Sequence, residues 1–197
     1  MWVIKVERGI MDNKEIAIQA ELKRRRLDNK SVNDKGLLWI DLYNLMIPSY
    51  PLHQASYDVC RWLINNGANV NEKDYLNRTA LFGADFEKSK LLISSGVEIN
   101  CIDYWEKTAL FFSDYKTTKL LIDSSINVNN LDKYGRNALF TADFEKSKLL
   151  IEAGIDIHPV DHDGCNALFD ADSKKYKLLV DLGINVSQKN IRNKTGE

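Results

Sequence analysis

The stretch TALFGADFEKSKLLI at residues 79–93 returns almost unchanged as NALFTADFEKSKLLI at residues 137–151. Residues 108–122 and 166–180 carry the same pattern, and residues 50–64 carry a more divergent copy. The period is 29 residues throughout. A fixed period of 20–50 residues is the signature of an array of stacked repeats. One leucine column makes the register visible: Leu52, Leu81, Leu110, Leu139 and Leu168.

Each copy carries the signals of one long helix with a defined start and end. An aspartate precedes the helix in four copies, and Ser56 does so in the first. A side-chain oxygen at this position can accept hydrogen bonds from the free N–H groups of the first turn, so these residues predict the helix start. Residues 143–153 then have helical periodicity, and Gly154 follows where a helix ends in left-handed backbone. Before the aspartate, the Thr/Asn-Ala-Leu-Phe segment predicts a short first helix of one to two turns. After the glycine, an alternating segment such as 155–157 predicts an extended arm, and an aspartate with nearby glycine predicts a turn.

The ten residues 84–93 recur identically as 142–151. Core packing explains the leucines, but we expect Glu87, Lys88 and Ser89 to face solvent, so recent duplication is the better explanation of their identity. Surface positions of these two copies should then carry little specificity.

The pattern resembles the ankyrin repeat. Residues 132–140, DKYGRNALF, stand where that family has D-x-x-G-x-T-P-L-H, and residues 51–55, PLHQA, match P-L-H-x-A. Residues 63–71, LINNGANVN, match L-L-x-x-G-A-D-V-N. The family unit has 33 residues, and the four missing here correspond to the end of the first helix and the turn between helices. The resemblance covers residues 48–195 and implies an all-α fold, an ankyrin-type helix-turn-helix solenoid of about five short repeats.

Residues 1–47 do not follow the repeat, and we expect them to form an N-terminal helical cap on the ankyrin-repeat array at residues 48–197. Residues 12–22 have the pattern of a capped helix. Residues 37–46 are apolar nearly all round and predict a second helix that covers the open end of the first repeat. We expect residues 1–10 not to be native, with translation starting at the next methionine.

Composition narrows the class of partner. Lys and Arg total 27 against 28 Asp and Glu, a formal net charge of −1, which argues against a general nucleic-acid binder. The longest apolar run is far shorter than the ~20 residues that span a bilayer. Three cysteines do not make a disulfide scaffold and favour reduced thiols. We therefore expect a cytoplasmic monomer with no nucleic-acid, membrane or cofactor partner.

Catalytic motifs for phosphate, dinucleotide or metalloprotease chemistry do not occur, so we expect no enzyme and no catalytic residue. His158, His162 and Cys165 are close enough in sequence for a zinc site. We favour the alternative that His158 replaces an asparagine of its column and His162 lies at a variable turn, which predicts no metal. A cysteine nucleophile is the minor alternative to core or turn roles for Cys60, Cys101 and Cys165.

The turn tips vary most between copies, and several of them carry aromatic residues. Exposed aromatics without a structural role favour a partner-binding edge. The alternative is that these side chains pack across adjacent tips and stiffen the array. The predicted partner-binding residues are Tyr75, Leu76, Tyr104, Trp105, Lys133, Tyr134 and His162.

The family resemblance implies a non-catalytic protein–protein interaction module. Small stand-alone ankyrin-like proteins with short Asn/Lys/Ile-rich repeats resemble bacterial proteins, so our first hypothesis is a bacterial immunity protein that neutralises a toxin. The alternative is a secreted bacterial effector, or an effector fragment, whose repeats recognise a host protein. Both rest on analogy at the level of the fold.

Overall fold

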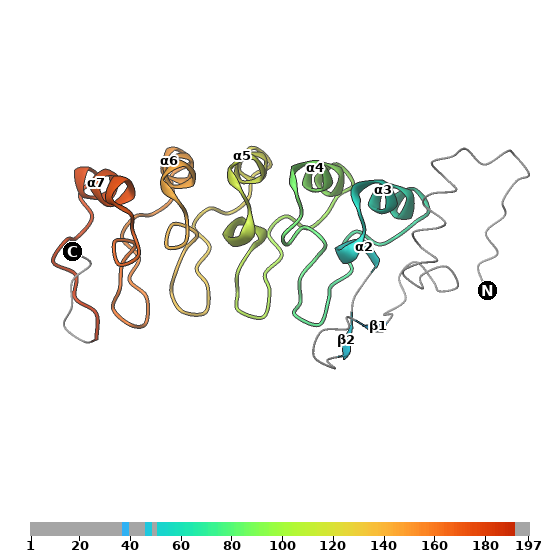
Figure 1. Ribbon diagram of the computed structural model, residues 1–197, viewed down its shortest axis with the longest axis horizontal. Helices are drawn as coiled ribbons and strands as arrows, with labels where there is room; N and C mark the ends of the chain where they lie inside the picture. Colours follow the sequence, from blue (N-terminus) through green and yellow to red (C-terminus); the bar gives the residue numbers. More distant parts are fainter. Residues whose placement is uncertain (1–36, 40–45, 49–50, 192–197) are drawn as a thin grey trace, which may run out of the picture. The chain divides into compact units, whose positions relative to one another are not determined.

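The computed structural model describes residues 37–39, 46–48 and 51–191 (Figure 1). The chain forms two compact units: the first contains the described residues up to Leu81 together with Glu87–Glu98, and the second contains Phe82–Phe86 together with the described residues from Ile99 onward. Both units are built from the same repeated helix and loop, and each is described by itself.

The first unit begins with two short antiparallel strands, β1 (Leu37–Trp39) and β2 (Met46–Pro48), in which Leu38 lies opposite Ile47. The predicted second N-terminal helix over residues 37–46 is therefore wrong at both of its ends. A short apolar run cannot be assigned to helix or strand by periodicity alone, and the proline that ends β2 favours an edge strand over a continuing helix. The helix predicted over residues 12–22 lies outside the described residues.

Three helices follow the strands: α2 (Pro51–Gln54), α3 (Tyr57–Asn65) and α4 (Phe86–Ser94). In the second unit, the one-turn helix η1 (Ala109–Phe112) precedes α5 (Tyr115–Asp123), and α6 (Phe144–Glu152) and α7 (Ser173–Asp181) complete the series. Figure 1 shows α5, α6 and α7 side by side, with their loops extending to the same side of the helices. The predicted ankyrin-type helical repeat fold is confirmed.

The long helices start as predicted at most of their caps. Asp114 and Asp143 each accept a hydrogen bond from a first-turn backbone N–H at 2.8 Å, and Asp172 accepts two at 2.9 Å. Ser56 occupies the corresponding position before α3 but makes no side-chain cap bond. Four of the five helix ends have a glycine with φ between 83° and 87°, and Ser125 takes the same left-handed backbone at φ 67°.

The predicted first helix forms in two of the five copies, where it is a single turn, whereas residues 80–83, 138–141 and 167–170 of the other three copies form turns and not helices. It is α-helical in α2 and 3₁₀-helical in η1. In the last two copies backbone bonds of 3.2 Å join the Phe140 N–H to the Asn137 carbonyl and the Phe169 N–H to the Asn166 carbonyl. The 29-residue unit leaves no room for a second turn, because the residues missing relative to the family unit are those that would continue it.

Lysine and serine side chains lie inside both units, next to the leucines. Lys88 is 7% exposed and Ser89 is fully buried, so the expectation that they face solvent is wrong. In helical geometry both residues share a face with Leu92, four and three residues later. Glu87, by contrast, is exposed. The same two helix positions are buried in α6, at Lys146 and Ser147.

The buried lysines connect consecutive copies. In the second unit, Lys146 Nζ donates to the carbonyls of Leu110 and Ser113, both at 2.8 Å. Lys175 Nζ donates to the carbonyls of Leu139 at 2.7 Å and Ala142 at 2.9 Å. Burial lowers the pKa of both ammonium groups to about 8.

In the first unit Lys88 Nζ makes the equivalent bonds, at 3.1 Å, to the carbonyls of His53 and Ala55. The other two long helices, α3 and α5, carry Val59 and Thr117 in this column. Thr117 is 2% exposed and, unlike the lysines, has no ammonium to donate to the carbonyls of the preceding copy.

Candidate partner-binding tips

Four turn tips are five-residue loops, each closed by its own aspartate. In the loop that begins at Asp132, the Oδ1 atom accepts from the backbone N–H groups of Tyr134 at 2.9 Å and Arg136 at 3.0 Å. The Asp132 N–H donates to the Arg136 carbonyl at 2.7 Å, and Gly135 has φ 81°. Aspartate favours such loops because its short carboxylate bonds to backbone two residues on. The same Oδ1 bonds recur in the loops that begin at Asp74, Asp103 and Asp161.

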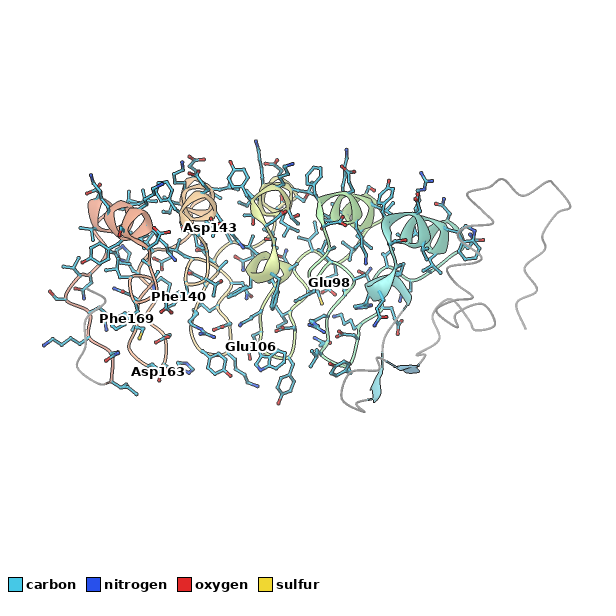
Figure 2. All side chains as sticks on the ribbon, in the orientation of Figure 1. Glu98, Glu106, Phe140, Asp143, Asp163 and Phe169 are labelled. Atoms are coloured by element: carbon cyan, nitrogen blue, oxygen red, sulfur yellow. The ribbon has the colours of Figure 1, made fainter. Side chains whose placement is uncertain are left out.

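Backbone hydrogen bonds join neighbouring tips within the second unit. The N–H of Lys133 donates to the Trp105 carbonyl at 2.9 Å, and the N–H of His162 donates to the Tyr134 carbonyl at 3.0 Å. Figure 2 shows Glu106 at the end of its loop, far from the long helices, whereas Asp143 lies at the start of α6. The tip side chains are therefore held at a fixed spacing on one edge of this unit.

Three predicted site residues come together at the first two tips of the second unit. Tyr104 is 63% exposed, and its ring meets the half-buried Trp105 edge to face, with centroids 5.6 Å apart. Lys133 Nζ lies 4.6 Å from the centre of the Tyr104 ring, a cation–π contact between neighbouring tips. The contact agrees with the alternative that side chains pack across adjacent tips. It nevertheless leaves most of the Tyr104 side chain exposed to solvent.

The other predicted residues lie apart from this cluster. Tyr134 is 46% exposed and stacks against the guanidinium of Arg136, which lies 4.8 Å from the ring centre. His162 is exposed and is joined to Tyr134 through its backbone. Tyr75, 51% exposed, and the half-buried Leu76 lie at a tip of the first unit.

An exposed apolar column at the tips was missed from the sequence. The residue before the tip aspartate is Ile102, Leu131 or Val160 in the three tips of the second unit closed by aspartate, with exposures of 39%, 46% and 43%. These three residues follow one another at the repeat spacing, so the signal was present in the columns. Exposed apolar side chains that adjoin exposed tyrosines are typical of interaction surfaces.

The tip carboxylates differ in how their second oxygen is satisfied. Arg136 donates to Asp132 Oδ2 through Nε at 3.3 Å and Nη2 at 3.0 Å, and in the first unit Arg78 holds Asp74 in the same way, at 3.0 and 2.8 Å. Asp103 has no such arginine. Its Oδ2 is buried and has no hydrogen-bond donor among the described residues.

Other candidate chemistry is sparse. In the part of the chain that the structure describes, no group of three or more His, Cys, Asp or Glu side chains could hold a metal ion. Cys60 and Cys101 are core residues, 0% and 2% exposed. Burial raises the pKa of the Cys60 and Cys165 thiols, which disfavours the thiolate that a nucleophile requires.

No helix among the described residues is long and apolar enough to cross a membrane. No curated protein matches the sequence. The family model of the ankyrin repeat matches residues 49–75, the copy whose P-L-H-x-A motif is complete. An ankyrin repeat indicates a protein–protein interaction module and is typically non-catalytic. Residues 49–75 thus match an ankyrin repeat within an ankyrin-type helical repeat fold, and the resemblance predicted from the sequence is confirmed.

Proposed function

We propose that this chain binds another protein through the tips of its second unit. The tip face, as we name it, consists of Ile102, Tyr104, Trp105, Leu131, Lys133, Tyr134 and Val160. The observation that carries the proposal is the exposure of its tyrosines and aliphatic residues, from 39% to 63%, on loops with rigid hydrogen-bonded backbones. A rigid backbone lowers the entropy lost when aromatic side chains are buried by a partner.

Two further arguments favour binding over internal stiffening. The backbone bonds between tips already fix their spacing, so aromatic packing is not required for it. Internal packing would also be better served by burial, whereas Tyr104 keeps 63% of its surface exposed. Tyrosine and tryptophan are the residues most enriched where interfaces gain their affinity. His162, at the next tip of the second unit, is proposed as an additional contact, and Tyr75 and Leu76 stay predicted partner-binding residues of the first unit.

For the biological role, we propose a non-catalytic cytoplasmic immunity protein of bacterial type that blocks a toxin. The alternative is a secreted bacterial effector, or a fragment of one, whose repeats recognise a host protein. The repeat type supports both by analogy. A toxin-like reading frame beside the gene would favour immunity, and secretion of the chain in culture would favour the effector.

The test compares matched aromatic substitutions. The partner is isolated with the tagged wild-type chain from its native cell and identified by mass spectrometry, and its affinity is then measured by calorimetry for Tyr104→Ala and Trp105→Ala. Tyr115→Ala is the control, because Tyr115 is 48% exposed but lies on helix α5, outside the tip face. We expect each tip variant to lose about 2 kcal/mol of binding free energy and the control to lose little. Losses below about 0.5 kcal/mol for both tip variants would exclude this face.

A further inference from the structure

The second unit contains its own example of how a tip binds a guanidinium group. Arg136 reaches back four residues, donates through Nε and Nη2 to Asp132 Oδ2, and stacks on the Tyr134 ring with its central carbon 4.8 Å from the ring centre. The carboxylate supplies paired acceptors and the ring supplies a face for the planar cation. Arginine suits this arrangement better than lysine, because its fork of donors matches a carboxylate and its plane stacks on an aromatic ring.

The neighbouring tip has the same parts except for the arginine. Asp103 occupies the aspartate position and Trp105 stands where Tyr134 stands in the next tip. Lys107 occupies the arginine position, but its ammonium lies 3.7 Å from Asp132 Oδ2, in the neighbouring tip. The same ammonium also lies 5.8 Å from the centre of the Phe111 ring. Asp103 is therefore left without a cation from its own loop.

The two carboxylate oxygens of Asp103 differ in their hydrogen bonding. Asp103 is 3% exposed, and its Oδ1 accepts from the N–H groups of Trp105 and Lys107, both at 2.9 Å. Its Oδ2 is buried and meets no donor among the described residues. Leaving a buried charged acceptor unpaired costs more than the hydrogen bond it lacks, so a donor that reached this oxygen would gain affinity.

We propose that Asp103 and Trp105 bind an arginine side chain presented by the partner protein. This assignment rests on the proposed function, since both residues lie at the tip face. The partner's guanidinium would donate to Asp103 Oδ2 and stack on Trp105, as Arg136 does with Asp132 and Tyr134. The ring of Tyr104 already carries the ammonium of Lys133, which leaves Trp105 as the aromatic face for the incoming cation.

Binding requires the buried Asp103 Oδ2 to become accessible. Asp103 Oδ2 is closed to solvent in the free protein, and the half-buried Lys107 stands at the position from which arginine reaches the aspartate in the loops of Asp74 and Asp132. Its interaction with Asp132 draws it toward the next tip. Because the Lys107 ammonium pairs with Asp132, the partner's arginine would not have to compete with Lys107 for Asp103.

Two substitutions separate this assignment from a purely structural role for Asp103. Asp103→Asn keeps Oδ1 and its two backbone bonds but removes the negative charge and the second acceptor. Lys107→Arg supplies the missing guanidinium within the chain, so it should occupy the site and raise the thermal midpoint. Both variants should therefore weaken arginine binding, one while leaving the loop intact and the other while stabilising it.

The first measurement needs no knowledge of the partner. A blocked Gly-Arg-Gly peptide is titrated into ¹⁵N-labelled full-length protein, with blocked Gly-Lys-Gly as the matched probe, and the indole N–H signal of Trp105 is followed by NMR. We expect a saturable shift with the arginine peptide in the millimolar range, as suits a single side chain. The lysine peptide should bind about tenfold more weakly, and so should the arginine peptide to either variant. Equal responses to both peptides, no response at all, or an unchanged response in Asp103→Asn would overturn the assignment.

The isolated partner distinguishes this assignment from the proposed function. If Asp103→Asn weakens the complex at least tenfold, along with Tyr104→Ala, both stand. If Tyr104→Ala and Trp105→Ala weaken it while Asp103→Asn does not, the tip face is the site but the partner's arginine is not bound there. If none of the three weakens it, the proposed function itself is wrong.

Discussion

Burial of the Lys146 ammonium should make the stability of this protein rise with pH in the alkaline range. The side chain is 6% exposed, and burial lowers its pKa from 10.5 to about 8, against the weaker opposing effects of Asp143 and Asp114. The unfolded chain solvates the lysine and keeps the ordinary pKa. Between these two values the unfolded chain binds more protons than the folded chain, so the free energy of unfolding increases with pH.

The magnitude follows from the two pKa values. Near pH 7 both states hold the proton, and the pH-dependent contribution is close to zero. By about pH 10 the folded state has lost the proton and the unfolded state has largely kept it, which amounts to about 2 to 3 kcal/mol. Deprotonation leaves two N–H donors on the amine, enough for the carbonyls of Leu110 and Ser113. Loss of the buried charge therefore strands neither carbonyl.

Urea unfolding, followed by circular dichroism, tests this with Lys146→Met. The stability advantage of the wild type over the variant should grow by about 2 to 3 kcal/mol between pH 7 and pH 10. Lys148→Met is the control on the same helix: its hydrogen bond to Glu145 raises the pKa of Lys148, so its slope should be flat or of opposite sign. If the gap between wild type and Lys146→Met were the same at both pH values, the reasoning would be refuted.

Three further substitutions should change stability in defined directions, each measured by urea unfolding. Ser125→Gly should stabilise by about 1 kcal/mol, because Ser125 has φ 67° at a helix end where the other four copies have glycine; a loss of stability would show that its side chain is needed. Thr108→Asn should stabilise by about 1 kcal/mol, because the buried Thr108 hydroxyl has no partner among the described residues, whereas Asn137 in the same column donates to the Asp156 carbonyl at 2.7 Å; Asn137→Thr should have the opposite effect. Asp143→Ala should destabilise by about 1 kcal/mol through loss of the cap bond to the first turn of α6, and faster amide exchange confined to that turn would locate the effect.

The helix starts and ends were predictable because their causes are local. A cap aspartate such as Asp143 meets backbone donors within its own helix, and a glycine such as Gly154 adopts left-handed backbone wherever the helix stops. Neither depends on a neighbouring copy. The strands at residues 37–39 and 46–48, by contrast, form through pairing with each other. An apolar run by itself does not specify which segment it will pair with.

The buried lysines were missed because residue type outweighed position. Lys88 and Ser89 lie four and three residues before Leu92, which assigns them to its buried face. A lysine in the sequence is nevertheless predicted to be exposed, since its charge is rarely buried without partners. The partners of Lys88 are carbonyls more than thirty residues earlier in the chain, and the sequence does not show that those carbonyls lack other donors.

At the candidate site, the sequence predicted which residues are exposed but not which charges are satisfied. The tip position of Tyr104 could be read from the columns. The contrast between Asp132 with Arg136 and Asp103 with Lys107 is also visible as a four-residue spacing. Burial of Asp103 Oδ2, however, and the turn of Lys107 toward the next tip are tertiary features.

The shortened repeat and the buried lysine are structurally related. A helix leaves its last carbonyls without intrahelical backbone donors. When the first segment of a repeat is a single turn, most of its carbonyls belong to this class. In a longer unit, the following residues would supply N–H groups to some of them. Here Lys146, from the next copy, supplies donors to Leu110 and Ser113, and Lys175 does so for Leu139 and Ala142. One lysine therefore supplies donors to carbonyls of a short turn and links one copy to the next, which explains why a charged residue occupies a core position in the helices that carry it.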